Sequence, residues 1–212
     1  MALRIGDIAP DFEQISTAGW LRFHAWKGAN WTVLFSHPHD FTPVCTTELG
    51  EASRLAPEFT ARGAKLIGLS VDTPERHAAW AEDIAAVSGH RPTFPIIADH
   101  DREVAHLYDM IHPNATTTQT VRVTFIIDPN NVVRLIQSYP NAIGRDFAEI
   151  LRALDALRLT DAEPVVTPAN WRKGEPVIAA PHLADAEVLA RFGAPLTTDL
   201  PYLRRVAQPV VA

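Results

Sequence analysis

The residues best suited to chemistry surround the single cysteine of the chain, Cys45, which ends the run Pro38–Cys45. Threonine is a good N-terminal cap and proline is well tolerated in a first helical turn. The sequence therefore predicts a helix capped by Thr42, with Pro43 as its first residue and Cys45 as its third. The thiol would face unpaired backbone N–H groups at the positive end of the helix dipole. This setting favours the thiolate, the nucleophilic form of cysteine, and we expect the sulfur to be reachable where the loop meets the helix.

An inert role for Cys45 is the main alternative, because a lone cysteine often behaves as a small buried hydrophobe. Two neighbours favour reactivity instead. Pro38 and Thr42 lie just before the cysteine on a loop that joins a strand to a helix, where sheet proteins of this kind place their sites. The Thr42 hydroxyl is suited to hydrogen-bond a substrate oxygen.

Arg122 is the natural charged partner of the cysteine, since it opens a strand made almost wholly of apolar residues. An arginine in such a strand is costly unless it is paired. Glu48 lies one helical turn after Cys45 and is placed to hold a guanidinium. Arg145 opens the last long predicted helix and is placed to join this network. The alternative, an Arg122 side chain that reaches water from a strand end, fits the spacing equally well.

Composition excludes several classes of function. The chain of 212 residues carries Lys+Arg 19 against Asp+Glu 25, a net charge of −6, and offers no basic surface for nucleic acid or an anionic membrane. No apolar run approaches the ~20 residues of a membrane helix, and the N-terminus lacks a signal-type stretch. One cysteine allows no intrachain disulfide. We therefore expect a cytoplasmic protein with no nucleic-acid partner and no membrane insertion, although an organelle address stays open.

Apolar, β-branched runs predict strands, and helical patterns fall between them. The strands are predicted at 31–36, 65–71, 94–98, 121–127 and 132–136, and the helices at 43–61, from 73 onward, at 101–108 and at 145–159. Early alternation of strand and helix implies parallel pairing, and the two late strands add an antiparallel part. The sequence therefore predicts an α/β fold with a mixed central sheet flanked by helices.

The composition and the pattern of the sequence change after Thr160. Residues 161–212 hold seven of the 17 prolines and show no clear strand series, although a short helix is predicted from Ala184 to Phe192. Roughly fifty residues do not easily bury a core of their own. We therefore expect a main domain over residues 1–160 and a C-terminal arm over residues 161–212, packed on the main domain, on a partner subunit, or on both.

Together these residues resemble the peroxiredoxins, thiol peroxidases on a thioredoxin-like fold. The family signature of Pro, two variable positions, Phe, Thr, Pro, one variable position and Cys is matched by Pro38–Cys45. Arg4–Phe12 and Val71–Thr73 also resemble the family, and Tyr139–Arg152 and Val166–Trp171 resemble its one-cysteine subfamily. The likeness covers nearly the whole chain. It implies a thioredoxin-like fold and no cofactor.

The resemblance implies a role for each matching residue. Cys45 is the peroxidatic cysteine, which attacks a peroxide, releases water or an alcohol and becomes a sulfenic acid. Pro38 shields the pocket from water, and Thr42 bonds the peroxide oxygen. Arg122 stabilises the thiolate and the developing negative charge.

Three further residues have supporting roles by the same resemblance. Glu48 and Arg145 fit the network around the guanidinium. His37 precedes the signature as it does in the one-cysteine subfamily, where this histidine lies near the sulfur. A strand-end histidine without a chemical role is an equally weighted alternative for His37.

The missing second cysteine determines the expected partners. With no resolving thiol in the chain, an external thiol must reduce the sulfenic acid, and glutathione or the thioredoxin system is expected to supply it. The resemblance also implies a homodimer or a higher ring of dimers, and a part in antioxidant defence and cell redox homeostasis.

Three rival interpretations remain open. The cluster His37-Pro38-His39-Asp40 invites a metal, but a zinc site needs three or four converging ligands, so we expect no metal. A Cys/His acyl-transfer enzyme requires a histidine base held against the sulfur. A redox sensor or holdase would use the same oxidisable cysteine to change its assembly state, and would react once per subunit rather than turn over.

Overall fold

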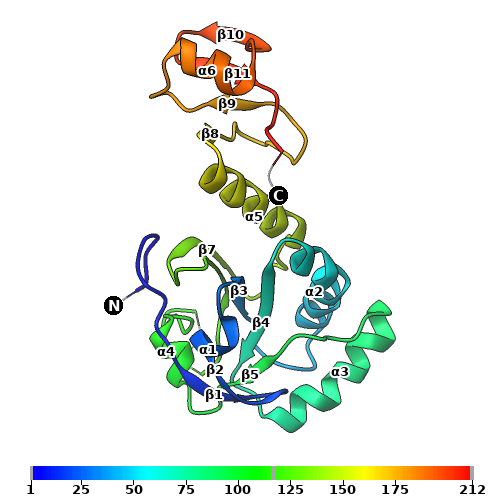
Figure 1. Ribbon diagram of the computed structural model, residues 1–212. Coiled ribbons are helices and arrows are strands. Elements are labelled where there is room, and N and C mark those ends of the chain that lie inside the picture. The colour runs from blue at the N-terminus through cyan, green and yellow to red at the C-terminus, as the bar shows by residue number, and fades with distance from the viewer. Residues whose placement is uncertain (1, 116–117, 211–212) are drawn as a thin grey trace. The chain divides into compact units, whose positions relative to one another are not determined.

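The computed structural model describes residues 2–115 and 118–210 (Figure 1). The chain divides into two compact units, residues 1–147 and residues 148–212. Each unit has its own sheet and its own hydrophobic core, and each is described in turn.

A seven-stranded mixed sheet forms the first unit, in the order β2-β1-β5-β4-β3-β6-β7. The central strands β3 (Trp31–Ser36), β4 (Ala64–Ser70) and β5 (Ile96–Ala98) are parallel. Strand β6 (Arg122–Ile127) runs antiparallel to β3, and β7 (Val133–Tyr139) runs antiparallel to β6. A hairpin of β1 (Glu13–Ser16) and β2 (Gly19–Arg22) completes the other edge. The predicted mixed α/β architecture is confirmed.

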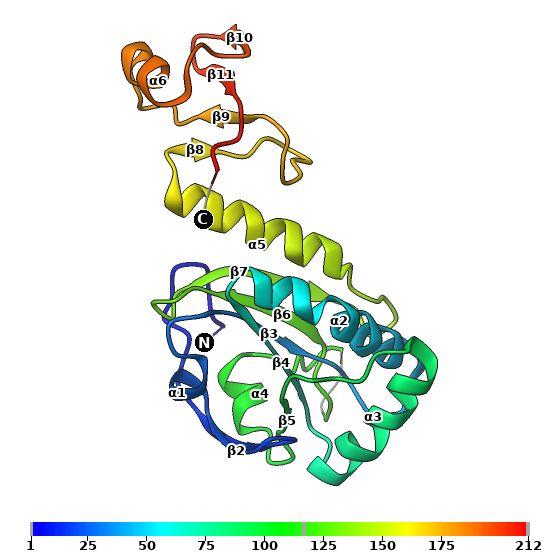
Figure 2. The same cartoon turned by 45° about the vertical axis from the view of Figure 1, so that its right-hand side comes forward.

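Helices cover both faces of this sheet. Helices α2 (Pro43–Ala61) and α3 (Pro74–Ser88) lie on one face, and α1 (Phe23–Lys27) and α4 (Glu103–Leu107) on the other (Figures 1 and 2). Strand β3 is buried at all six positions because it is covered from both sides. Since α2 follows β3 directly, its first turn lies at the carboxyl end of a central strand, next to the start of β6.

The elements of the first unit that carry strong local signals lie where the sequence predicts them. Helix α2 begins at Pro43 after Thr42, and α3 begins at Pro74 after a Thr73 cap whose side chain accepts from the Arg76 N–H. The hairpin β1–β2 and helix α1 were missed. Their four- and five-residue lengths are too short for an apolar period to show.

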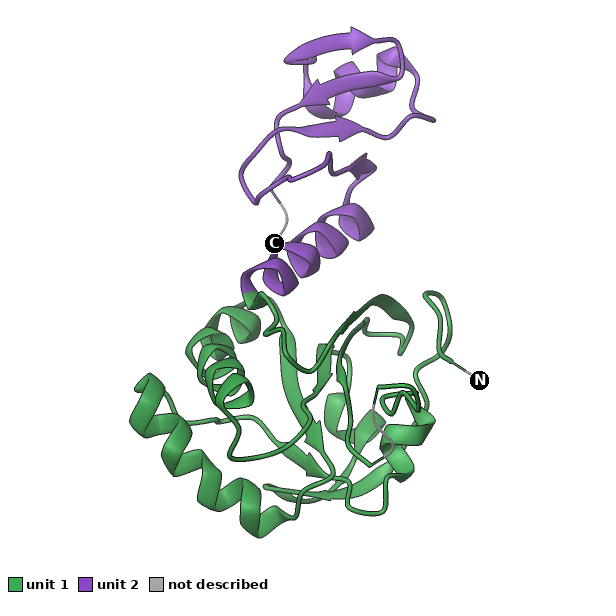
Figure 3. Cartoon of the chain, turned by 180° about the vertical axis from the view of Figure 1, so that it is seen from behind, with its two compact units in different colours: residues 1–147 green, residues 148–212 purple. Residues whose placement is uncertain are grey.

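The second unit is a four-stranded antiparallel sheet with two helices (Figure 3). The strands β8 (Val165–Val166), β9 (Val177–Ala179), β10 (Thr197–Leu200) and β11 (Leu203–Val206) pair in the order β10-β11-β9-β8. The helices are α5 (Phe147–Ala162) and α6 (Asp185–Phe192). The expectation of no strand series here was therefore wrong, because strands of two to four residues leave no readable alternation.

This second unit also has a core of its own, contrary to expectation. Trp171, Val177 and Val188 are buried in it, together with Leu159 of α5. The contribution of α5 explains how so short a segment encloses an apolar centre. The division between the units falls after the first residue of α5, between residues 147 and 148, whereas the sequence prediction drew the boundary near the end of this helix, between residues 160 and 161.

None of the helices in the part of the chain that the structure describes combines the length and the hydrophobicity that a membrane span requires.

Candidate active site

Cys45 is the third residue of α2, as the sequence predicts. Thr42 is the N-cap, with extended backbone (φ −119°, ψ 148°), and Pro43 is the first helical residue. The Thr42 side chain does not cap the helix, contrary to the usual use of threonine there. Its hydroxyl instead donates to the His39 carbonyl at 2.8 Å, while its own carbonyl accepts from the Thr46 N–H at 2.9 Å. The Thr42 hydroxyl oxygen is thus left with lone pairs that can accept a hydrogen bond.

Arg122 contacts the cysteine sulfur. Its Nη1 donates to Cys45 Sγ at 3.3 Å and to Glu48 Oε2 at 2.6 Å, while Nε and Nη2 both donate to the Asn141 carbonyl, at 3.1 and 2.8 Å. The Arg122 side chain is buried. The alternative of a guanidinium that reaches water is therefore wrong. A cation held this way stabilises an anionic sulfur in preference to a neutral one.

Glu48 lies between two arginines. Besides the contact with Arg122, its carboxylate accepts from Arg145 through the backbone N–H (2.8 Å), Nε (2.9 Å) and Nη2 (2.8 Å). Burial raises the pKa of Glu48, but the hydrogen bonds and positive charge of Arg145, with Arg122, outweigh it and lower the pKa. Arg145 also donates to Val123 O and Thr124 Oγ1. The carboxylate is therefore ionised and fixes both guanidinium groups.

The cysteine side chain is fully buried, which differs from the expectation of a reachable sulfur. Cys45 shares the inward face of α2 with Glu48, Leu49 and Ala52, at the i, i+3, i+4 and i+7 positions. That spacing turns the sulfur toward the sheet and Arg122 rather than toward solvent. At the helix start, Thr42 and Val44 keep partial exposure, whereas Pro38 is buried.

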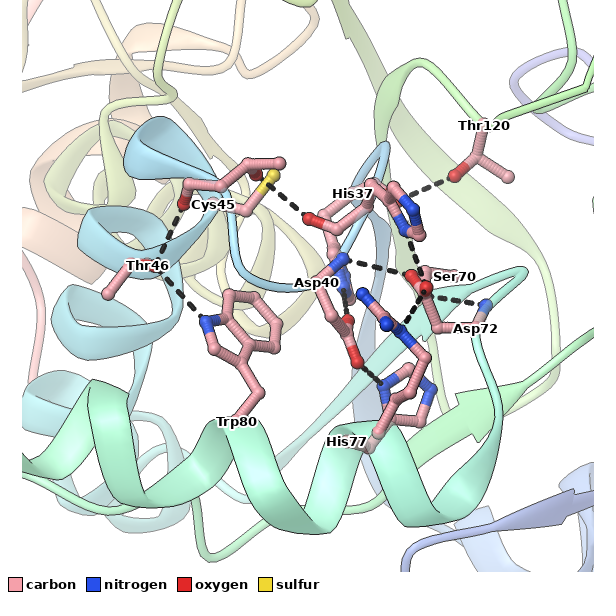
Figure 4. A network of polar contacts seen from close by, with 12 residues as sticks. His37, Asp40, Cys45, Thr46, Ser70, Asp72, His77, Trp80 and Thr120 are labelled. Carbon is pink, nitrogen blue, oxygen red and sulfur yellow. Dashed lines mark hydrogen bonds and ion pairs between the residues drawn. The ribbon is translucent and has the colours of Figure 1, made fainter.

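A second buried network adjoins the first, around His37 (Figure 4). His37 Nε2 lies 2.8 Å from Asp40 Oδ1, and His77 Nδ1 lies 2.7 Å from Asp40 Oδ2. Burial raises the pKa of Asp40, but the hydrogen bonds and charges of the two histidines lower it to about 2. The ionised carboxylate only accepts, so both facing ring nitrogens carry hydrogen. The pKa of His37 is lowered, and burial is the largest cause. The Nδ1 atom of His37 is enclosed and has no hydrogen-bond partner among the described residues.

His37, Asp40 and His77 are also close enough together to ligate a metal ion, since their ligand atoms lie within 4.8 Å of one another. The set differs from the sequence candidate: His39 turns away to Asp72 (2.5 Å between Nδ1 and Oδ1), and His77 takes its place. The ligand atoms that face one another, His37 Nε2, His77 Nδ1 and the two Asp40 carboxylate oxygens, are already paired by hydrogen bonds.

Comparison with known proteins gives the family. The AhpC/TSA family model matches residues 5–136, and the model of the C-terminal domain of 1-Cys peroxiredoxin matches residues 156–194. Peroxiredoxin-6 of Rattus norvegicus is 48% identical, over 98% of this chain and 98% of the relative. The chain belongs to the one-cysteine peroxiredoxins. It is accordingly a thiol-dependent peroxidase.

Two solved peroxiredoxins have the same fold as the chain. The crystal structure of a cysteine-to-serine mutant of Peroxiredoxin 6 of Arenicola marina superposes with a TM-score of 0.92 at 42% identity, covering 98% of this chain and 99% of that one. The yeast mitochondrial 1-Cys peroxiredoxin, studied for thiol resolution via glutathione/thioredoxin systems, gives 0.90 at 46% identity, covering 97% and 99%. The thioredoxin-like fold is thereby confirmed.

The peroxiredoxin site brings together most of the residues that the sequence singles out. Cys45, Arg122, Glu48 and Arg145 form one hydrogen-bonded cluster, and Pro38 and Thr42 lie on the loop before it. His37 is held by Asp40. Sequence reasoning missed three contributors: the Asn141 carbonyl, Asp72 and His77. The last two carry no local signal of this role, since Asp40, the loop residue that each contacts, lies more than thirty residues away in the chain.

Proposed function

We propose that this peroxiredoxin reduces hydrogen peroxide and organic hydroperoxides through the Cys45 thiolate. A sulfur–oxygen bond forms as the peroxide oxygen–oxygen bond breaks. The sulfur loses two electrons and becomes a sulfenic acid, and the leaving oxygen takes them with a proton as water or an alcohol. The supporting observation is the 3.3 Å contact between Arg122 Nη1 and Sγ, in a guanidinium whose other donors are fixed by Glu48 and Asn141.

The neighbouring residues have distinct parts in this step. Arg122 stabilises the thiolate and the negative charge that develops on the peroxide oxygens. Thr42 accepts a hydrogen bond from the peroxide O–H, because its own hydrogen is directed at the His39 carbonyl. Pro38, which is buried, keeps water from the sulfur. Glu48 and Arg145 hold Arg122 in place.

The second step uses a thiol from outside the chain, since Cys45 is its only cysteine. An external thiolate attacks the sulfenic sulfur, releases water and leaves a mixed disulfide, which a second thiol reduces. The yeast relative was studied with both glutathione and thioredoxin systems, which supports either donor here. We further propose a cytoplasmic homodimer, or a ring of dimers, that acts in antioxidant defence and redox homeostasis.

Stopped-flow mixing tests the first step. The reduced protein is mixed with hydrogen peroxide, an alkyl hydroperoxide and a lipid hydroperoxide, and with excess thiol donor to follow turnover. Cys45→Ser should abolish turnover, because a hydroxyl ionises far too weakly to replace the thiol. Turnover retained in that variant would refute the proposal. A single oxidation per subunit with every donor would instead favour the sensor interpretation, and thioester hydrolysis would favour the acyl-transfer one.

A further inference from the structure

The loop that carries the proposed peroxide-binding residues is strained. Phe41 has a left-handed backbone (φ 57°), a conformation that a bulky L-residue rarely adopts. The residue is 46% exposed, so it is not held in this conformation by burial in the core. Such a conformation persists only where the surroundings hold it. Because Phe41 directly precedes Thr42, whatever holds this residue also places the Thr42 hydroxyl.

Two buried carboxylates hold the loop. Asp72, just after β4, accepts from the Asp40 backbone N–H at 2.9 Å and from Ser70 Oγ at 2.9 Å, and its other oxygen faces His39 and Arg76. Asp40 is itself on the loop and directs its carboxylate to His37 and His77. The loop therefore does not hold its conformation alone, because one of the two hydrogen-bond donors to its buried Asp40 carboxylate, His77, lies outside the loop.

Helix α3 supplies that donor. His77 is fully buried, its Nδ1 donates to Asp40 Oδ2 at 2.7 Å, and its Nε2 lies 3.2 Å from the Ile97 carbonyl of β5. Helix α3 also packs near the strained residue. The Arg76 guanidinium carbon lies 5.2 Å from the Phe41 ring centre, and the Trp80 ring centre lies 6.4 Å from it. His77 is thus anchored to the sheet by one nitrogen and to the loop by the other.

We propose that His77 is a positioning residue for peroxide reduction. It acts through Asp40 to keep the loop in the strained form that sets the positions of Pro38 and Thr42 just before the helix that carries Cys45, and this inference rests on the proposed function of those residues. Without the Nδ1 donor, His37 is the one remaining partner of the buried Asp40 carboxylate among the residues that the structure describes. The loop then relaxes toward an ordinary backbone at Phe41, and the Thr42 oxygen leaves the position in which it is proposed to accept from the peroxide.

Two substitutions test the contacts of the two His77 ring nitrogens separately. The amide nitrogen of Asn lies near the place of Nδ1, and that of Gln near the place of Nε2. H77N therefore keeps a donor for Asp40, whereas H77Q keeps only the donor for Ile97. We expect H77Q to lower the second-order rate with hydrogen peroxide by roughly ten- to a hundredfold, as small misplacements of a reacting group do. H77N should stay within about threefold of wild type, since it keeps the positioning contact.

A double-mutant cycle with Thr42→Val shows whether His77 acts through the loop. In the T42V background H77Q should have a smaller effect than in wild type, because the Thr42 hydroxyl, one of the two groups that the loop positions, is gone. Full additivity of the two losses would overturn the proposal, and so would equal rates for H77N and H77Q. Urea unfolding of each variant measures the loss of stability separately. A merely structural histidine would change the stability of the protein, but its effect on the rate would not depend on Thr42.

The control for the proposed function is run in the same assay. Should wild type turn over and H77Q match it, the positioning role fails while the peroxidase function stands. Should wild type not turn over, the function itself fails. If H77Q does not fold, Asp40→Asn replaces it in the cycle, and additivity of D40N with T42V would refute the proposal in the same way.

Discussion

Replacing Glu48 by glutamine removes one negative charge from the centre of the arginine cluster without changing its shape. If the amide oxygen takes the place of Oε1, it keeps both contacts with the Arg145 backbone N–H and Nε. The amide nitrogen then takes the place of Oε2, where it meets the Arg122 Nη1 and Arg145 Nη2 donors at 2.6 and 2.8 Å. Two charge-assisted hydrogen bonds are lost, and two buried cations are left without a carboxylate.

The free energy of this loss follows from the burial. Charged hydrogen bonds contribute about 1.5–3 kcal/mol each, and breaking a buried ion pair by removing one partner costs about 3–5 kcal/mol. We expect E48Q to lower the free energy of unfolding by about 3–5 kcal/mol. With a urea m-value of about 2–3 kcal/mol/M, the midpoint should fall by about 1–2.5 M. The rate with peroxide should fall as well, because Arg122 loses its anchor.

Glu51 provides a matched control on the same helix. It accepts two hydrogen bonds from Arg54, at 2.8 and 2.6 Å, but both side chains are about half exposed (40% and 52%). Exposed pairs of this kind contribute about 0–1 kcal/mol. Urea unfolding of E51Q should therefore nearly match wild type. An E48Q midpoint indistinguishable from that of E51Q would refute the view that the buried carboxylate organises the site.

Three further outcomes are expected. Arg122→Lys should lower the peroxide rate in stopped flow by about a hundredfold, since a point charge cannot replace a fork that binds sulfur, carboxylate and carbonyl at once; a rate near wild type would contradict the assigned role. The pKa of Asp40 is lowered from 3.8 to about 2 on folding, so its contribution is present above pH 4 and is lost as the pH falls toward 2. D40N should lack about 2 kcal/mol of this acid-dependent stability, and urea titrations from pH 5 to pH 2 that show parallel curves would exclude the effect. Gly50→Ala should destabilise the protein by about 1–3 kcal/mol, because the added Cβ would lie 2.6 Å from Ser88 Cβ; Ser88→Gly should restore the melting temperature, and failure of this rescue would refute the packing argument.

The parts of the fold that sequence reasoning predicts are those whose signals are local. A threonine followed by proline marks the starts of α2 and α3, and a run rich in apolar and β-branched residues marks β3. The second unit was not predicted because its core gathers residues from distant short segments, such as Leu159 and Val206. No pattern within either segment indicates that both belong to one core.

The candidate site divides in the same way. Cys45 and Glu48 are one helical turn apart, so their shared face is readable from spacing. The pairing of Arg122 with Glu48 was inferable only because a buried arginine requires an anion. The Asp40–His77 contact joins residues 37 positions apart. A histidine in an amphipathic helix gives no sign of which nitrogen will find a partner.

The charges enclosed around Cys45 have a consequence for the order of events. With Cys45 ionised, as the proposed function requires, two guanidinium groups, one carboxylate and one thiolate sum to zero, so the enclosure is electroneutral before oxidation. A neutral sulfenic acid leaves one positive charge uncompensated in a poorly hydrated interior, which is costly. The oxidised site therefore attracts an anion, and an arriving thiolate is one. The positive charge that stabilises the Cys45 thiolate for its attack on the peroxide also attracts the external thiolate that reduces the oxidised cysteine.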